Sequence, residues 1–319
     1  MKEKIIWSRD ILGPEYEMTT VRQPDDYVGP VVCTVVRFRS SLNCRRGILY
    51  IHGFNDYFFQ APMGRIFDSH GYRFYAVDLR RYGRSIRSGQ PKFKIKSLTE
   101  YFPDIEAALD IMTDDGIDEV TIMGHSTGGL IASLYMEEHP LPEVKGLILN
   151  SPFLAWNLPA PMRHIGVPLV RFLSRIAPEI HLNAGGTVKY PAAFARHFGG
   201  EWDYDTQWKP DLLPPVEAQW IRAIDSAQKS VLRGTVKVPV LLLHSDKSAL
   251  PSEPAGNFRC ADGVLDVKSI AAAGRQLGPK VTEVTIRGGL HDLLISPAPV
   301  RDKAYSIIFA WLTRLPAMK

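Results

Sequence analysis

The sequence lacks any strong excess of charge and any long hydrophobic run. Its 319 residues carry a formal net charge of +4, which is too small to indicate a nucleic-acid partner, and no run of lysines or arginines forms a phosphate-binding stripe. No stretch approaches the roughly 18 consecutive apolar residues of a membrane span. These absences argue against a nucleic-acid partner and against a membrane-spanning protein.

Cysteine is also scarce. The chain has three cysteines, Cys33, Cys44 and Cys260, and their odd number and wide spacing predict neither a disulfide framework nor a metal site. The first ten residues contain no apolar core of a secretory signal. We therefore expect reduced thiols in a cytoplasmic protein that uses no metal and no cofactor.

What the sequence does contain is a regular alternation of strand and helix patterns. Hydrophobic residues make up 45% and charged residues 23% of the chain, which is an ordinary globular composition. Strands are expected at residues 31–38, 47–52, 72–78, 119–123, 144–150, 238–244 and 281–286. Helices are expected at residues 59–70, 98–114, 130–138, 267–277 and 300–315. This order predicts an α/β fold with a mostly parallel central sheet and helices on both faces.

The alternation stops between residues 151 and 235. This stretch is rich in proline and contains four of the six tryptophans, namely Trp156, Trp202, Trp208 and Trp220. Its pattern predicts helices joined by loops, without strands. We therefore expect a helical cap at 151–235, inserted between an N-terminal part (1–150) and a C-terminal part (236–319) of one core.

One segment of the expected cap has an amphipathic pattern. Apolar residues recur near helical spacing at Ile165, Leu169, Phe172, Leu173 and Ile176. The simpler interpretation is a helix that packs this apolar side on the domain, with Pro168 limiting its length. The alternative is a lid that guides acyl chains or makes transient contact with an anionic membrane surface.

The most informative motif is Gly124-His125-Ser126-Thr127-Gly128, which has the form G-x-S-x-G. It follows a buried strand pattern and precedes a helix pattern, which is the context of a nucleophile elbow. Glycines flank the serine because its backbone turn is strained and crowded. The motif predicts Ser126 as a nucleophile at the N-terminal end of a helix.

A serine nucleophile needs a histidine to accept its proton and a carboxylate to orient that histidine. In this fold the order along the chain is serine, acid, histidine. His291 lies in a glycine-containing loop directly after the last expected strand. We therefore predict His291 as the general base.

Two aspartates are candidates for the acid. Asp246 follows the 238–244 strand by two residues, and Asp262 follows a longer loop. Asp266 directly precedes a helix pattern and is better suited to be its N-cap. The residues themselves leave Asp246 and Asp262 as equal alternatives.

An oxyanion hole needs two backbone N–H groups directed at the developing negative charge. Thr127, which follows the nucleophile, is expected to supply one, and Phe54 in the loop after residues 47–52 the other. Gly53 allows this loop to approach a substrate closely. His52 and His125 are expected to be structural, ordering the loop and packing beside the elbow.

With these residues the chain resembles the α/β-hydrolase superfamily, and more narrowly the branch of monoacylglycerol lipases, lysophospholipases and serine aminopeptidase-like hydrolases. The motifs that carry the resemblance are Leu49-Tyr-Ile-His-Gly-Phe-Asn-Asp56, Asp78-Leu-Arg-Arg-Tyr-Gly-Arg-Ser85, Gly124-His-Ser-Thr-Gly-Gly129, Pro239-Val-Leu-Leu-Leu-His244 and Gly289-Leu-His-Asp292. They extend over most of the chain from about residue 47.

The resemblance bears on two further positions. Relatives show an Asp-x-x-x-Asp spacing before the next helix, which Asp262 and Asp266 match, so the resemblance favours Asp262 over Asp246 as the acid. Relatives usually have glycine where Arg81 stands. The turn must therefore differ here, or the backbone of Arg81 must lie outside the left-handed region.

The resemblance implies a serine hydrolase that cleaves carboxylic esters, with lipid-like monoesters such as monoacylglycerols or lysophospholipids as substrates. The first alternative is an aminopeptidase-like amide hydrolase. It would need carboxylates in the cap to hold a free amine, for which the candidates are Glu201, Asp203, Asp205 and Glu217. The second alternative is a relative that binds a ligand without catalysis.

Overall fold

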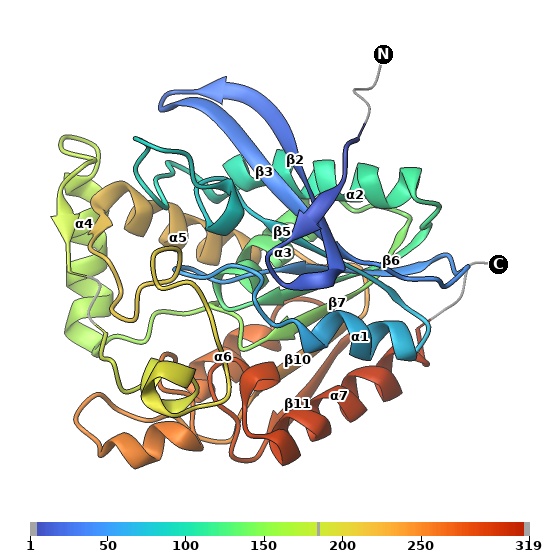
Figure 1. Ribbon diagram of the computed structural model, residues 1–319. Helices are drawn as coiled ribbons and strands as arrows, with labels where there is room; N and C mark the ends of the chain where they lie inside the picture. The colour runs from blue at the N-terminus through green and yellow to red at the C-terminus, as the bar shows by residue number, and fades with distance from the viewer. Residues whose placement is uncertain (1–4, 184–185, 316–319) are drawn as a thin grey trace.

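The computed structural model describes residues 5–183 and 186–315, and within them a single sheet of nine strands forms the centre of the molecule (Figure 1). The strand order is β1-β2-β3-β5-β4-β6-β7-β10-β11. From β5 to β11 neighbouring strands are parallel, whereas β1, β2 and β3 pair antiparallel at one edge. The strands are β1 (Ser8–Asp10), β2 (Gly13–Asp26), β3 (Gly29–Phe38), β4 (Arg46–Ile51), β5 (Arg73–Asp78), β6 (Glu119–His125), β7 (Val144–Asn150), β10 (Val240–Ser245) and β11 (Val281–Ile286).

Helices cover both faces of this sheet, as the sequence predicted. On one face, α1 (Pro62–Ser69) and α7 (Ala298–Leu312) pack against the sheet in a shared hydrophobic cluster, and Figure 1 shows them next to each other. A second cluster on the other face contains α2 (Phe102–Asp114), α3 (Thr127–Glu138) and α6 (Val267–Gly274). The prediction of an α/β architecture with a mostly parallel sheet is confirmed.

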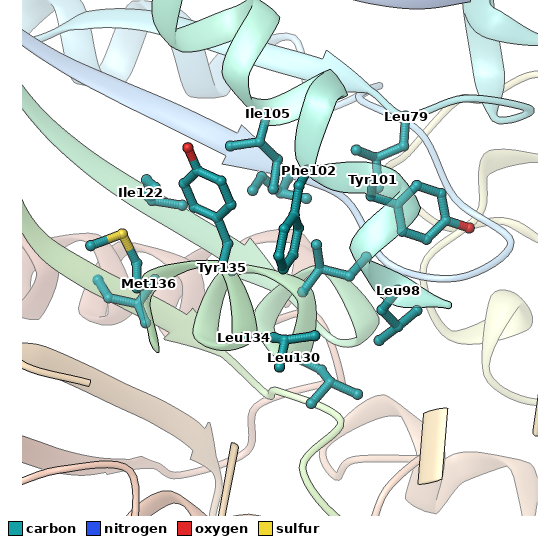
Figure 2. Close-up of a cluster of buried hydrophobic side chains, with 14 of the residues drawn as sticks. Leu79, Leu98, Tyr101, Phe102, Ile105, Ile122, Leu130, Leu134, Tyr135 and Met136 are labelled. Atoms are coloured by element: carbon teal, nitrogen blue, oxygen red, sulfur yellow. The ribbon is translucent and has the colours of Figure 1, made fainter. Parts of the chain in front are cut away.

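The packing of α2 against α3 fixes the position of the helix that follows Ser126. Figure 2 shows Phe102 and Ile105 of α2 directed at Leu134 and Tyr135 of α3. The rings of Phe102 and Tyr135 meet edge to face with centroids 5.2 Å apart, a geometry that aromatic pairs favour. Because these side chains are buried, α3 has little freedom to shift its N-terminal end.

The N-terminal region contains more strand than the sequence predicted. Only residues 31–38 were expected to be extended, but β1 and β2 precede β3. The sequence pattern missed β2 because many of its side chains are exposed at the edge of the sheet. A strand with little buried surface has a weak apolar signal, and its pairing with β3 determines its conformation.

Arg81 occupies a left-handed backbone conformation, with φ of 65°. Of the two alternatives for this turn, a backbone outside the left-handed region is therefore wrong. The strain, about 1–2 kcal/mol for a residue with a side chain, is offset by two contacts of the buried guanidinium. It pairs with Asp26 of β2 and donates a 2.8 Å hydrogen bond to the carbonyl of Lys94.

Residues 151–235 connect β7 to β10, which are neighbours in the sheet. We call them the connecting segment. They contain a π-helical turn (Met162–Gly166), α4 (Val167–Leu173), β8 (His181–Leu182), two 3-10 turns (Pro191–Ala193 and Arg196–Phe198), β9 (Val216–Glu217) and α5 (Ala218–Val231). The prediction that this segment has no strands is wrong, because β8 and β9 pair antiparallel. Each is two residues long, too short to produce an alternating pattern.

The apolar side of α4 faces away from the domain, so the expectation that it packs on the domain is wrong. We define the apolar row as Ile165, Leu169, Phe172 and Ile176, which are 54–75% exposed. The side of α4 that faces α5 instead carries Val167 and Ser174, both nearly fully buried, and Arg171, which pairs with Asp225 of α5 at 2.6 Å.

Candidate active site

Ser126 lies in a strained turn between β6 and α3. Its φ is 51° and its ψ is −118°, a conformation that residues with a side chain rarely adopt. A Cβ at Gly128 would lie 2.3 Å from the carbonyl oxygens of Ile51 and His52, and one at Gly124 would lie 2.6 Å from the carbonyl oxygen of Gly128. The glycines are therefore required because the backbone passes so close. Ser126 itself is partly exposed.

The structure brings Ser126, His291 and Asp262 together. Nε2 of His291 lies 2.9 Å from Oγ of Ser126, and Nδ1 lies 2.9 Å from a carboxylate oxygen of Asp262. The other oxygen of Asp262 accepts hydrogen bonds from the backbone N–H groups of Val264 and Leu265, at 2.8 and 2.7 Å. His291 and Asp262 are buried, so their interaction is weakly screened by water.

The two candidate acids have different environments. Asp262 is fully buried and faces His291, whereas Asp246 is exposed and accepts a 2.8 Å hydrogen bond from the N–H of Gly288. The long loop between them returns to the residues that directly follow β10, where the N–H of Asp262 donates to the carbonyl of Lys247 at 2.9 Å. Asp266 caps α6 by accepting from the N–H of Ser269, as the sequence predicted.

The loop expected to carry one oxyanion donor runs directly beside the serine. A Cβ at Gly53 would lie 3.1 Å from Cβ of Ser126. Phe54 follows, and its ring packs against Trp220 of α5 with centroids 4.6 Å apart. Thr127 is the first residue of α3, so its N–H has no acceptor within the helix.

His52 and His125 both bind backbone groups. Nε2 of His52 accepts from the N–H of Leu79 at 3.1 Å, so its Nδ1 carries the proton and donates to the carbonyl of Gly53 at 2.8 Å. His125 places Nδ1 3.2 Å from the carbonyl of Asn150. Burial lowers the pKa of His125, against the opposing effect of Asp292, so its ring is neutral at pH 7. These contacts agree with the structural roles expected for both histidines.

Several residues that surround the histidine loop were not predicted from the sequence. Asp292 is buried and accepts hydrogen bonds from the side-chain amides of Asn150 and Gln60, at 2.7 and 3.0 Å. The hydroxyl of Tyr190, in the connecting segment, accepts from the N–H of Asp292 at 3.2 Å, and its ring lies against His291. Asp292 could have been found from the sequence, because it directly follows His291. Asn150, Gln60 and Tyr190 are far from His291 in the chain, and only the fold brings them to this loop.

Comparisons with known proteins agree with this geometry. Residues 43–297 match the family described as serine aminopeptidase, S33. The chain belongs to this family. It is therefore a hydrolase with the α/β-hydrolase fold, as the resemblance of its motifs implied. Within the residues that the structure describes, no group of three or more His, Cys, Asp or Glu side chains is arranged to hold a metal ion.

Individual relatives come from several organisms. Phospholipase YtpA of Bacillus subtilis is 28% identical over 209 residues, which cover 64% of this chain and 76% of the relative. Among solved structures, a soluble variant of monoglyceride lipase from Saccharomyces cerevisiae, in complex with a substrate analog, superposes with a TM-score of 0.67. It is 17% identical, and the match covers 92% of this chain and 95% of that one. Monoacylglycerol lipase of Paleococcus ferrophilus is 20% identical with a TM-score of 0.61, covering 83% and 93%.

Proposed function

We propose that this protein is a serine carboxylic ester hydrolase in which Ser126, Asp262 and His291 form a catalytic triad. The observation that carries the proposal is the pair of 2.9 Å contacts on the two ring nitrogens of His291, one to Ser126 and one to Asp262. A serine hydroxyl becomes a useful nucleophile when a histidine accepts its proton and a buried carboxylate orients that histidine.

In the proposed acylation step, Oγ of Ser126 attacks the ester carbonyl carbon while its proton passes to Nε2 of His291. The carbonyl electron pair moves onto oxygen, and Asp262 stabilises the imidazolium through Nδ1–H. When the tetrahedral intermediate collapses, the ester C–O bond breaks and the leaving alcohol takes the proton from His291. A water molecule, deprotonated by His291, then hydrolyses the acyl-enzyme in the same way.

The negative oxygen of each tetrahedral intermediate needs two donors, and we assign these to the backbone N–H groups of Phe54 and Thr127. Gly53 lies against Ser126, and Thr127 begins α3, so both groups border the serine. The positive end of the helix adds to this stabilisation. A donor of this kind contributes about 10²–10³-fold to turnover.

We propose that the acyl group of the substrate packs against the aromatic side chains beside Phe54. The rings of Phe54, Phe93 and Trp220 line a small pocket of about 60 Å³ together with Val216 of β9. The charged side chains of Lys92, Lys94 and Glu217 also border it. Phe54 contacts both other rings, with centroid distances of 5.1 Å to Phe93 and 4.6 Å to Trp220. Because β9 and α5 form one side, the connecting segment contributes to the proposed acyl pocket, as a cap would.

The named relatives also support a lipid-like substrate. The matched proteins include a phospholipase and two monoacylglycerol lipases. We therefore propose a monoacylglycerol or lysophospholipid as the substrate class, and a cap formed by residues 151–235. A cytoplasmic location stays a prediction from the sequence.

The aminopeptidase alternative is less well supported, although the family description names that activity. All four carboxylates proposed to hold a free amine already have partners. Glu201 pairs with Arg301, Asp203 with Arg196 and Glu217 with Lys94, while Asp205 accepts from the N–H groups of Gln207 and Trp208. An amine would have to share one of these carboxylates with its present partner or displace that partner.

The test of the proposed function is a hydrolysis panel that compares medium-chain p-nitrophenyl esters, a monoacylglycerol and proline β-naphthylamide. We expect hydrolysis of the esters and little release of the naphthylamine. Preference for the amide would favour the aminopeptidase. A folded wild-type protein that hydrolyses none of them and is not labelled by a fluorophosphonate would favour a non-catalytic binding protein.

The apolar row suggests where the enzyme meets its substrate. It forms part of a larger exposed group on the connecting segment, made up of Met162, Ile165, Leu169, Phe172, Leu173, Ile176 and Ile180. Arg163 and Arg175 are exposed among them. We propose that this surface makes transient contact with an anionic lipid surface, because apolar side chains flanked by basic ones favour such interfaces. No described helix has the length and hydropathy needed to cross a membrane.

We expect the double variant Leu169→Ser/Phe172→Ser to bind phosphatidylglycerol-containing vesicles at least about tenfold more weakly than wild type. Each side chain contributes roughly 1.5 kcal/mol or more when it is buried in an apolar environment. Vesicle co-sedimentation measures this partition. The matched control is Ile11→Ser/Leu250→Ser, which removes two side chains of similar exposure, 59% and 54%, outside the surface. Equal binding by wild type and both variants would contradict the proposal.

A further inference from the structure

Asn150 joins the chain segments that carry the serine and the histidine. It is the last residue of β7, and its carbonyl accepts the N–H of Ser126 at 3.1 Å. Its side-chain oxygen accepts the N–H of Leu293 at 3.1 Å, and its side-chain nitrogen donates to Asp292 at 2.7 Å. Because Asp292 and Leu293 directly follow His291, one asparagine contacts both segments.

These contacts lie in a closed environment. Asn150 and Asp292 are 1% and 2% exposed, and Gln60 is fully buried. Besides the amide of Asn150, the carboxylate of Asp292 accepts from the side chain of Gln60 at 3.0 Å and from the N–H of Leu294 at 2.9 Å. A buried carboxylate that loses a donor is costly, because water cannot replace it. The orientation of Asp292 is therefore specified by its donors.

We propose that Asn150 is a positioning residue that sets the separation between Ser126 and His291. This inference rests on the proposed function, because it concerns the reaction that those two residues would perform. Asn150 does not touch the reacting atoms and acts through the backbone of the two segments. A displacement of about 1 Å between a nucleophile and its base can cost about 10²-fold in rate.

The variant Asn150→Asp tests this role with almost no change of shape. It keeps the acceptor for Leu293 but places two buried carboxylates in contact, and such a pair holds one shared proton at low pH. The shared proton replaces the lost N–H donor. When it dissociates at higher pH, the two carboxylates repel each other and the loop is displaced. The titratable groups that face this pair are His125, His291, Tyr50, Tyr190 and Tyr305.

The experiment measures kcat and KM for a p-nitrophenyl ester from acidic to alkaline pH. For Asn150→Asp we expect kcat near wild type at acidic pH and about 10²-fold lower at alkaline pH, with little change in KM. Asn150→Leu, which removes both side-chain hydrogen bonds, should lose about 10²-fold at every pH. The matched control is Asn257→Asp, since Asn257 also donates to a carboxylate at 2.7 Å (Glu253) but is exposed. Asn257→Asp should keep the wild-type dependence of kcat on pH.

Three results would overturn the inference. One is an Asn150→Asp profile parallel to wild type in a folded protein. Another is a loss of kcat that occurs only where circular dichroism shows the variant to be unfolded at that pH. Asn150 would then stabilise the fold without positioning the two residues. The third is a folded wild type that neither hydrolyses esters nor reacts with a fluorophosphonate, which removes the proposed function as well. The first two leave the proposed function intact, so the failures are distinguishable.

Discussion

Ser126→Ala is expected to lower ester hydrolysis by about 10⁴–10⁶-fold and to abolish covalent labelling by a fluorophosphonate. Alanine removes the oxygen that would form the acyl-enzyme, while the donors assigned to Phe54 and Thr127 stay in place and leave a small residual rate. The measurements are kcat/KM for a medium-chain p-nitrophenyl ester and labelling detected on a gel.

The matched control for this prediction is Ser133→Ala in the same helix. The hydroxyl of Ser133 donates to the carbonyl of Gly129 at 2.7 Å and is fully buried. Its loss removes one hydrogen bond and no proposed reacting group, so near wild-type turnover is expected. Labelling of Ser126→Ala at the wild-type rate would show that another residue is the nucleophile.

Asp262→Asn is expected to lower kcat by about 10⁴-fold, whereas Asp246→Asn should change it by less than about tenfold. An asparagine at position 262 no longer stabilises the imidazolium, and its amide N–H can face Nδ1 of His291 and favour the wrong tautomer. At position 246 the amide oxygen can still accept the N–H of Gly288, and the side chain is exposed.

The measurement is kcat for the same ester at the pH of maximal wild-type turnover. Both substitutions remove one negative charge, so the comparison controls for charge. If Asp246→Asn were inactive and Asp262→Asn active, the acid would be Asp246, and the 2.9 Å contact between Asp262 and His291 would have another role.

The elbow was the part of the candidate site that the sequence predicted best. Gly124 and Gly128 are needed by contacts formed within a few residues of Ser126 or with the neighbouring strand β4. A short, apolar strand pattern and a helix pattern on either side were sufficient to predict that geometry. His291 was predictable for a similar reason, because the last strand, a glycine-containing loop and the final helix follow each other directly.

The local sequence pattern did not determine which aspartate is the candidate acid. Asp246 and Asp262 both follow β10, and their spacing left them as equal alternatives until the resemblance favoured Asp262. In the structure the loop between them closes on itself, since the N–H of Ala249 binds the carbonyl of Asp262 at 2.7 Å. This contact joins residues 13 positions apart in the chain, and sequence periodicity does not report such contacts.

The apolar row on α4 shows a related limit. Helical spacing correctly predicted that Ile165, Leu169 and Phe172 share one side, but the expectation that this side is covered was wrong. A hydrophobic pattern reports which side chains lie together. Whether another element packs on them depends on where that element is placed.

The sequence by itself determined the α/β alternation, the strained turn at Ser126 and the loop position of His291, because these depend on interactions between residues close in the chain. Only the tertiary structure placed Asp262, and not Asp246, against His291. It also left the side chains of the apolar row exposed and brought Asn150 into contact with Asp292. Those features depend on pairs such as Asn150 and Asp292, which are 142 residues apart. Their contacts form only after the sheet and its helices have packed.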